Sequence, residues 1–462
     1  MESVPDHHAR RSLVLFWILC AIYVVVLGLV IQLFLLPRFF PTWDRGDGLL
    51  VRTDSWTFHR LAVELADQVG SQGWAAWELR PNGEAPAGLA AAIYALTCPK
   101  PWVLLPINAV MHATGAVLLV VMIQRLVRDN RWALVGALPF VLFPSALRWT
   151  TQIHKDGATI LGFYMFACAL LILASPTSWH PRWRPGLWAL LLGFAGVSLV
   201  WVYRPYMSLM VQLVGLAAMV IIGLRLLLAA HKSALPVTRA WVAVALVGGL
   251  LVSLTVLTRA GTGTAGMNDD QVSPGSAGAV HRVAWESQPW MPKPLDTIFR
   301  SLANRRQMYI ESYPEAGSNV DVRVEFRDYT DVLVYIPRAS EIGLLAPFPS
   351  TWMGAGTLPS TTLMRRAAIP EMIVIYLALL VLPLAIWRWR RKADLWILLV
   401  LCLGMLVGYA LVVANVGTLY RMRYPYIMLL VGLSVAAAAS WIEQVLRDRR
   451  TRRADPAGPP GR

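Results

Sequence analysis

Long apolar runs recur along the chain from Ser12 to Leu446, separated by short polar segments and by two long ones. A helix needs about 20 mainly apolar residues to cross a hydrocarbon core of roughly 30 Å. Ten runs approach this length, and each is predicted to be a transmembrane helix: 12–36, 102–124, 132–148, 157–175, 187–203, 206–229, 240–258, 369–387, 395–414 and 424–446. The pattern therefore predicts an all-α polytopic membrane protein.

The basic residues between the predicted spans indicate which face of the membrane each connection occupies. With the N-terminus inside, every short basic cluster falls on the same face, as the positive-inside rule requires. These clusters are Arg125, Arg128 and Arg131; Arg182 and Arg184; Arg225, Lys232 and Arg239; Arg388, Arg390, Arg391 and Lys392; and Arg447, Arg449, Arg450, Arg452 and Arg453. We therefore expect both termini in the cytoplasm and a multi-pass protein of the cell membrane, inner or plasma.

The spacing of the spans divides the chain into four parts. An N-terminal transmembrane module (1–258) is followed by an extracytoplasmic loop or small domain (259–368) and by C-terminal transmembrane helices (369–446). The remaining residues, 447–462, are basic and end in a run rich in Pro and Gly, so we expect a disordered cytoplasmic tail.

The first outer segment, about 37–101, carries a second kind of helical pattern. Its apolar residues recur at the spacing of an amphipathic helix: Phe58, Leu61, Ala62, Leu65, Ala66 and Val69. Such a helix is predicted to lie on the membrane surface. A second apolar piece, 85–96, is too short to span the membrane and is expected beside the first.

Composition narrows the class of protein. Hydrophobic residues make up 56% of the 462 residues, charged residues 15%, and the mean hydropathy is +0.52. A typical soluble domain has roughly 25% charged residues. These values exclude a soluble enzyme with a membrane tail, a disordered scaffold and a secreted domain held by disulfides. The net charge of +15 flanks the apolar helices, so it does not indicate a nucleic-acid partner.

Two acidic residues on separate outer connections are candidate catalytic groups. Asp54 lies at the start of the predicted surface helix, and Asp156 ends the short polar connection 149–156. Each has two interpretations, because Asp is also a favoured helix cap. Asp44 and Asp47 lie in an Asp-Arg-Gly-Asp-Gly sequence, where a role in a turn is the preferred interpretation.

Basic residues at the outer ends of helices run against the positive-inside bias. They are Lys155, Arg204, Arg421 and Arg423. They either extend to lipid headgroups as isolated side chains or converge on one anionic group, for which guanidinium suits phosphate. We expect them to hold a lipid phosphate, with His59 and His154 as further substrate-binding candidates. One carboxylate would then act as general base while the cations offset charge on the departing phosphate.

The segment 53–62, Thr-Asp-Ser-Trp-Thr-Phe-His-Arg-Leu-Ala, resembles the first outer loop of GT-C-type glycosyltransferases. The nearest group contains protein mannosyltransferases, lipid A aminoarabinose transferases and the bacterial RgtA/B/C/D-like enzymes. Asp156 occupies the place of a second acid that is common in the family, and 420–425 is also similar. In those proteins a second acid typically follows the first, whereas Ser55 stands there in this chain.

This resemblance implies a sugar donor linked to polyprenyl phosphate and a glycan, lipid or protein acceptor on the extracytoplasmic face. It assigns Asp54 as the general base, supported by Asp156. The sequence indicates no cofactor and no metal ligand set.

Two alternatives use other residues. A polysaccharide polymerase or O-antigen-ligase-like enzyme would use the late outer loop, and its site would be His281, Arg282, Arg305 and Arg306. A lipid or glycan transporter or flippase would keep ionisable groups near the middle of the membrane. His112 is the one titratable residue in the middle of a predicted span, and an interhelical hydrogen bond is its preferred interpretation.

Overall fold

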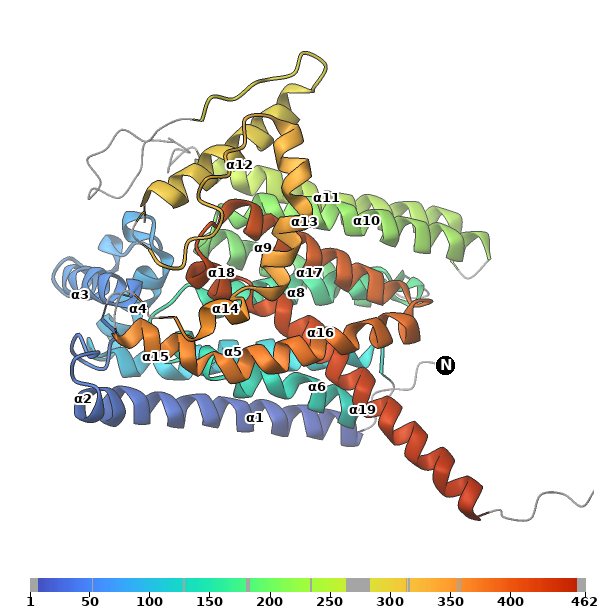
Figure 1. Ribbon diagram of the computed structural model, residues 1–462, viewed down its shortest axis with the longest axis horizontal. Helices are drawn as coiled ribbons and strands as arrows, with labels where there is room; N and C mark the ends of the chain where they lie inside the picture. Colours follow the sequence, from blue (N-terminus) through green and yellow to red (C-terminus); the bar gives the residue numbers. More distant parts are fainter. Residues whose placement is uncertain are drawn as a thin grey trace, which may run out of the picture.

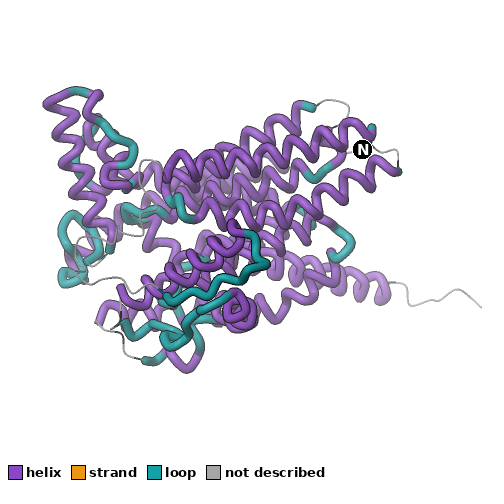
Figure 2. The backbone as a smooth tube through the Cα atoms, turned by 90° about the horizontal axis from the view of Figure 1, so that it is seen from above, coloured by secondary structure: helices purple, strands orange, loops and turns teal. Residues whose placement is uncertain are grey.

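The computed structural model describes residues 7–51, 53–127, 129–179, 183–232, 235–262, 283–312, 314, 316–354, 356 and 359–454. Within these ranges the secondary structure is helical, and the β-type pairing consists of two isolated bridges (Figure 2). Eight helices are long and apolar enough to cross a membrane, or nine if one bent pair counts as a span. The protein is therefore an all-α polytopic membrane protein, as the sequence predicts.

Eight of the ten predicted spans correspond to long helices. These are α1 (His7–Val30), continued by the short elements η1 (Ile31–Leu35) and α2 (Leu36–Phe39), α5 (Leu105–Gln124), α8 (Asp156–Leu173), α9 (Arg184–Tyr203), α10 (Met207–His231), α16 (Ile369–Trp389), α17 (Ala393–Val412) and α19 (Tyr424–Ala454). The span predicted at 240–258 falls on α11 (Val237–Thr262), which packs along α10 and whose side chains are described as far as Val252.

The span predicted at 132–148 is not one straight helix. It consists of α6 (Asn130–Leu142) and α7 (Pro144–Thr150), which meet at an angle of 65°. Phe143, between them, has extended backbone angles (φ −63°, ψ 126°). A residue before proline is disfavoured in the helical conformation, so Pro144 explains the break. Arg148 lies on α7, after this bend.

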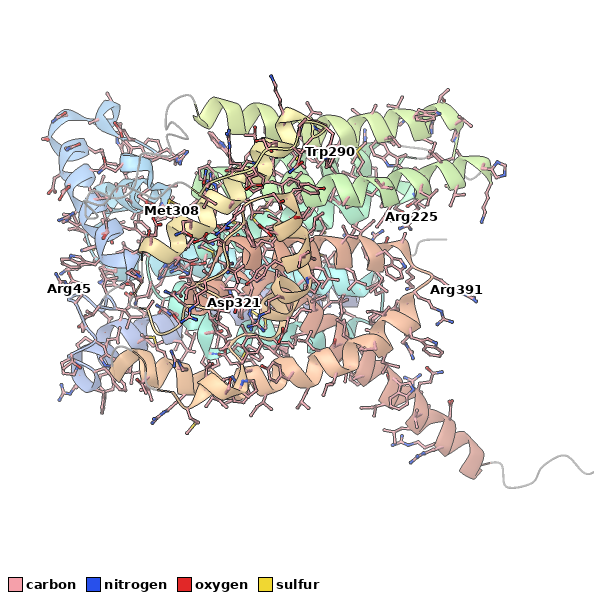
Figure 3. The ribbon with its side chains drawn as sticks, turned by 45° about the horizontal axis from the view of Figure 1, so that its top comes forward. Arg45, Arg225, Trp290, Met308, Asp321 and Arg391 are labelled. Carbon is pink, nitrogen blue, oxygen red and sulfur yellow. The ribbon has the colours of Figure 1, made fainter. Side chains whose placement is uncertain are left out.

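The start of α1 and the end of α19 lie at the same end of the bundle, opposite the helices of the first outer segment (Figure 1). Arg225 and Arg391, from two of the basic clusters, lie at the end of the termini, whereas Arg45 lies at the other end (Figure 3). This arrangement agrees with the predicted topology. The helix α19 continues to Ala454, so residues 447–454 are helical rather than disordered, and 455–462 lie outside the described residues.

The first outer segment contains the predicted surface helix as α3 (Asp54–Gln72), with α4 (Ala85–Leu96) packed against it. The apolar face of α3 is buried against α4, in a cluster that includes Phe58, Ala62 and Leu65. The helical spacing of these residues thus predicted the buried face, and the partner of that face is α4. This small core fixes the start of α3, where Asp54 lies.

The late outer segment packs directly on the spanning helices. It forms α12 (Lys293–Ser312), α13 (Tyr329–Leu345), α14 (Pro349–Trp352) and α15 (Pro359–Ala367). Its buried residues Phe326, Ala339 and Ile342 belong to the same hydrophobic core as the spanning helices, and α13 packs along α17. Residues 318–320 also pair with the chain just before α18 (Val416–Met422), where Val320 N donates to Ala414 O at 2.8 Å. The late segment therefore supports α18.

Two glycines allow α8 and α9 to pack closely. A Cβ atom at Gly162 would lie 2.5 Å from the backbone oxygen of Gly196, and a Cβ atom at Gly196 would lie 2.5 Å from the backbone oxygen of Gly162. Small residues at such contacts let helix backbones approach, which is the usual basis of helix association in membranes. The contact matters for function because α8 begins at Asp156 and α9 ends next to Arg204.

We expect Gly162→Ala to lower the free energy of unfolding by about 1–3 kcal/mol, because the added methyl group overpacks the interface. The matched control is Gly223→Ala in α10, where an added Cβ has nothing within 4 Å. Unfolding titrations in mixed micelles measure both variants. Equal stability of the two variants would contradict the close contact.

Candidate active site

Four helix ends meet at the end of the bundle that the sequence predicts to be extracytoplasmic, called the outer face below, and bring together two carboxylates and two guanidinium groups. Arg204 Nη2 donates to Asp156 Oδ1 at 2.7 Å. Arg421 Nε lies 3.5 Å from Asp156 Oδ2, and Arg421 Nη1 lies 3.7 Å from Asp54 Oδ2. The predicted residues Asp54, Asp156, Arg204 and Arg421 thus form one site, contributed by α3, α8, the end of α9 and α18.

The pair formed by Asp156 and Arg204 is deeply buried. Each side chain is 3% exposed. Burial alone would lower the pKa of Arg204, but the Asp156 carboxylate raises this pKa well above its ordinary value. A buried charge is stable only when it is paired and hydrogen-bonded. The two residues therefore hold each other in the charged state and fix the geometry of the site.

Asp54 has the opposite environment, with a side chain that is 59% exposed. The interpretation of Asp54 as a helix cap is wrong, because the N-cap position of α3 belongs to Thr53. Asp156 is not a cap either, since Lys155 holds that position in α8. By contrast, Asp44 does serve a turn, where it accepts a hydrogen bond from Gly46 N at 2.9 Å.

His154 lies beside Asp156 in the site, and its imidazole ring is neutral. Its Nδ1 lies 3.7 Å from Asp156 Oδ2, and its buried Nε2 has no hydrogen-bond partner in the described part of the chain. Burial lowers the pKa of His154 to about 4, despite the nearby Asp156 carboxylate. The imidazole is therefore uncharged near pH 7.

Two other predicted binding residues lie beside the site or away from it. Lys155 forms an ion pair with Glu84 at 2.5 Å and lies over the ring of Phe58, so it lines the edge of the site with its charge already matched. His59 is buried between α3 and α4, where its Nδ1 is 2.9 Å from the hydroxyl of Tyr94. The structure thus gives His59 a place in the packing of the outer segment.

Arg423 does not join the other cations, which corrects the expected convergence of four. Its side chain is fully buried and donates to Gly343 O at 2.9 Å and to Met372 Sδ at 3.3 Å. Arg421 and Arg423 are two residues apart at the end of α18, and side chains at that spacing do not face each other on a helix. Arg423 therefore anchors α18 to α13 and α16.

Arg148 is a site residue that the sequence reasoning missed. The charged groups that act on it electrostatically are Arg421, Asp156 and Asp54, so it lies at the same cluster. Arg148 is the last residue of the span predicted at 132–148, so it was not treated as a site candidate. In the structure it lies on α7, after the bend before Pro144. The signal that could have found it is the one that singled out the other cations, namely an arginine at an outer helix end.

Glu371 holds α7 and α18 together beneath this cluster. It accepts hydrogen bonds from Ser145 N at 2.6 Å and from the hydroxyl of Tyr420 at 2.5 Å. Ser145 precedes Arg148 by three residues, and Tyr420 precedes Arg421 by one. The carboxylate at the start of α16 therefore brings the two arginine-bearing helices together.

The late segment carries a tyrosine whose electrostatic surroundings include two arginines of the site. Among the charged groups acting on Tyr309 in α12 are Arg204 and Arg421, and burial raises the pKa of its phenol. Arg306, one helical turn earlier, is buried within the late segment and donates to Asp321 O at 3.1 Å. Arg305 lies 3.5 Å from Ser301 Oγ, and His281 and Arg282 lie outside the described residues.

His112 lies away from the cluster and stacks on Phe140 with ring centroids 4.5 Å apart. The expected interhelical hydrogen bond is absent at its buried Nε2, which has no hydrogen-bond partner among the described residues. Across those same residues there is no group of three or more His, Cys, Asp or Glu side chains that could hold a metal ion.

Comparison with protein-family models, with curated proteins and with solved structures finds no match for the chain. The functional proposal accordingly depends on the geometry of the cluster and on the resemblance of its motifs.

Asp156→Asn is expected to lower the free energy of unfolding by about 3–5 kcal/mol, because it leaves Arg204 buried without its counter-charge. The double variant Asp156→Asn with Arg204→Gln should recover at least half of this loss. Unfolding titrations of the two single variants and the double variant form a thermodynamic cycle. Additive losses in the double variant would show that the two residues do not depend on each other.

His154 predicts a pH dependence of stability. The unfolded chain takes up a proton near the ordinary pKa of 6.5, whereas the folded chain resists this until about pH 4. The wild type should therefore lose stability relative to His154→Gln as the pH falls from 6.5, by about 2 kcal/mol at pH 5. Melting curves of both proteins from pH 7.5 to 4.5 measure the difference. Parallel curves would contradict a buried neutral imidazole.

Proposed function

We propose that the protein is a membrane glycosyltransferase that moves a sugar from a polyprenyl-phosphate-linked donor to an acceptor on the extracytoplasmic face. The single observation that carries this proposal is the pairing of one exposed carboxylate, Asp54, with Arg421, which also reaches the buried Asp156. An accessible base next to fixed cations is the arrangement that transfer to a hydroxyl from a lipid phosphate requires.

Exposure separates the roles of the two carboxylates. A general base has to come within hydrogen-bond reach of the acceptor hydroxyl, and the exposed Asp54 is accessible to such a group. Asp156 is enclosed by Arg204, Arg421 and His154, so its proposed role is to position the cations. This assignment refines the prediction that both carboxylates take part directly in catalysis.

The arginine side chains have a separate proposed role, which is to stabilise the departing phosphate. As the glycosidic bond to the lipid phosphate breaks, negative charge grows on the departing phosphate oxygen. Arg421, held between two carboxylates and supported by Glu371 through Tyr420, is a pre-positioned donor for that charge. Fixed donors of this kind stabilise a developing anion without reorganisation during the reaction.

The proposed partners are a polyprenyl-phosphate sugar, an acceptor that is a glycan, lipid or protein, and the surrounding membrane lipid. The proposed location is the inner or plasma membrane, with the cluster outside. The alternative polymerase or ligase site loses a principal residue, since Arg306 is already bound to Asp321 O and lies against the rings of Phe326 and Tyr335.

The test uses the full chain in proteoliposomes with a panel of undecaprenyl-phosphate-linked, radiolabelled hexoses and pentoses. With isolated cell-envelope glycan and lipid supplied as acceptors, the wild type should transfer label from at least one donor, and Asp54→Asn should reduce the rate at least about 100-fold by removing the base. Asp44→Asn, which changes the turn residue of the same segment, is the matched control and should keep the wild-type rate.

Melting temperatures establish that each variant is folded. Undiminished transfer by folded Asp54→Asn, or no transfer from any donor by the wild type, would overturn the proposed function.

A further inference from the structure

The helix α13 of the late segment is apolar on both of its faces. One face lies in the hydrophobic core against α17 and carries Val332, Ala339 and Ile342. On the other face, Val334 is 79% exposed and Leu345 is 36% exposed. A helix that is apolar all round is either enclosed by protein or in contact with lipid. The depth of α13 along the bundle decides between these environments.

The C-terminal half of α13 lies beside α17, within the length that crosses the membrane (Figure 1). The 20 residues of α17 extend over about 30 Å, which matches the thickness of the hydrocarbon core. A Cβ atom at Gly343 would lie 2.9 Å from the backbone oxygen of Leu406. Leu406 lies six residues before Val412, the outer end of α17. Gly343 is therefore about 9 Å inside the outer boundary of the core.

The N-terminal half of α13 lies nearer to that boundary. Arg306 donates from Nη1 to Leu411 O at 3.4 Å and from Nη2 to the hydroxyl of Tyr335 at 3.3 Å. Tyr335 is therefore beside the outer end of α17. The chain that precedes α13 pairs with residues just beyond this end. The helix thus begins at the outer boundary and descends toward Leu345.

Side chains satisfy the backbone carbonyls at the deep end of α13. Gly343 O accepts a hydrogen bond from Arg423 Nη1 at 2.9 Å, and Leu345 O accepts one from the hydroxyl of Tyr376 at 2.7 Å. At a helix end in water, solvent can satisfy the last carbonyls. In hydrocarbon no water is present, so protein groups have to do so. The donors at this end are therefore those that a helix terminus within the membrane requires.

The two charged residues in the middle of α13 are compatible with this depth. Arg338 Nε donates to Asp321 Oδ2 at 2.9 Å, and Arg338 Nη1 donates to Glu341 Oε2 at 2.9 Å. Asp321 precedes the helix and accepts a hydrogen bond from Arg306, which lies at the outer end of α17. The guanidinium group of Arg338 is thus directed back toward the membrane surface, as long basic side chains in membranes commonly are.

We propose that α13 is a re-entrant helix in the outer leaflet and that its exposed apolar face contacts the acyl chains of membrane lipids. The chain turns back directly after the helix, where Pro347 O accepts a hydrogen bond from Trp352 Nε1 at 2.8 Å. The ring of Trp352 lies 5.8 Å from that of Tyr376. The next spanning helix, α16, then starts at the outer face. This inference is independent of the proposed function.

The placement also explains the buried position of Arg423. This residue joins α18 to the deep end of α13, and Arg421 lies two residues earlier in the same short helix. The re-entrant helix therefore holds α18 from within the membrane.

The experiment measures the surroundings of nitroxide labels on the full-length protein in liposomes of phosphatidylcholine and phosphatidylglycerol. The labels are attached to Leu345→Cys and, separately, to Val334→Cys. Cys98 is replaced by Ser, and the other native cysteines are buried. The matched control is Glu325→Cys, because the Glu325 side chain is 53% exposed in the same late segment. Collisions with oxygen report hydrocarbon, and collisions with a water-soluble nickel chelate report water.

Both labels on α13 should collide with oxygen more often than the control label does. Collisions with the nickel chelate should fall at least about fivefold at position 345, because hydrocarbon excludes polar solutes. Equal access of the chelate to positions 345 and 325 would place α13 in water and overturn the proposal. Low access of both reagents to position 334 would indicate a covering protein and would overturn lipid as the occupant.

A melting experiment tests the deep end of α13 without a label. Tyr376→Phe should lower the melting temperature in liposomes by about 2–4 °C, because Leu345 O would lose its donor where no water can replace it. The matched control is Tyr23→Phe in α1, whose hydroxyl makes no hydrogen bond with the described residues. Equal melting temperatures of the two variants would overturn the placement of this helix end in hydrocarbon.

Discussion

The outer-face cluster of Asp54, Asp156, Arg204 and Arg421 depends on the buried ion pair between Asp156 and Arg204. Because both side chains are almost fully enclosed, removing either one would leave the other buried without its main counter-charge. The pair joins the start of α8 to the end of α9, and the contact between Gly162 and Gly196 holds these helices at the required distance. Backbone packing within the membrane thus sets the position of charges at its surface, and Arg421 is placed by reference to Asp156.

The rest of the site is assembled around that pair from segments far apart in sequence. The α3 and α4 core sets the exposed Asp54, the bend before Pro144 sets α7, and Glu371 joins α7 to α18. The late segment supports α18 from the other side through pairing of 318–320 with the chain before it. These supports come from four separate segments, and together they hold the charged side chains of the site in place.

The sequence predicted the elements whose signal is local. Apolar length predicted the spans, and helical spacing predicted the buried face of α3, because both follow from the physical environment of single segments. Polarity at outer helix ends likewise identified Asp54, Asp156, Arg204 and Arg421. The short helices α7 and α18 were not predicted, so the directions of their side chains could not be predicted either. For that reason Arg423 was grouped with Arg421, and Arg148 was hidden in a span that the structure bends.

The two ends of the bundle show why burial decides the meaning of an unbalanced charge. At the end of the termini, Asp394 accepts hydrogen bonds from Arg125 and Arg225, so two guanidinium groups again share one carboxylate. Those arginine side chains are 25% and 30% exposed, and water and counter-ions can offset the surplus there. Each of them also has its hydrogen bond. At the outer face, Asp156 is likewise shared by two guanidinium groups, those of Arg204 and Arg421, whose side chains are 3% and 19% exposed. The shared carboxylate is 3% exposed at the outer face and 9% exposed at the end of the termini, so the outer pair depends more on its counter-charges and less on water.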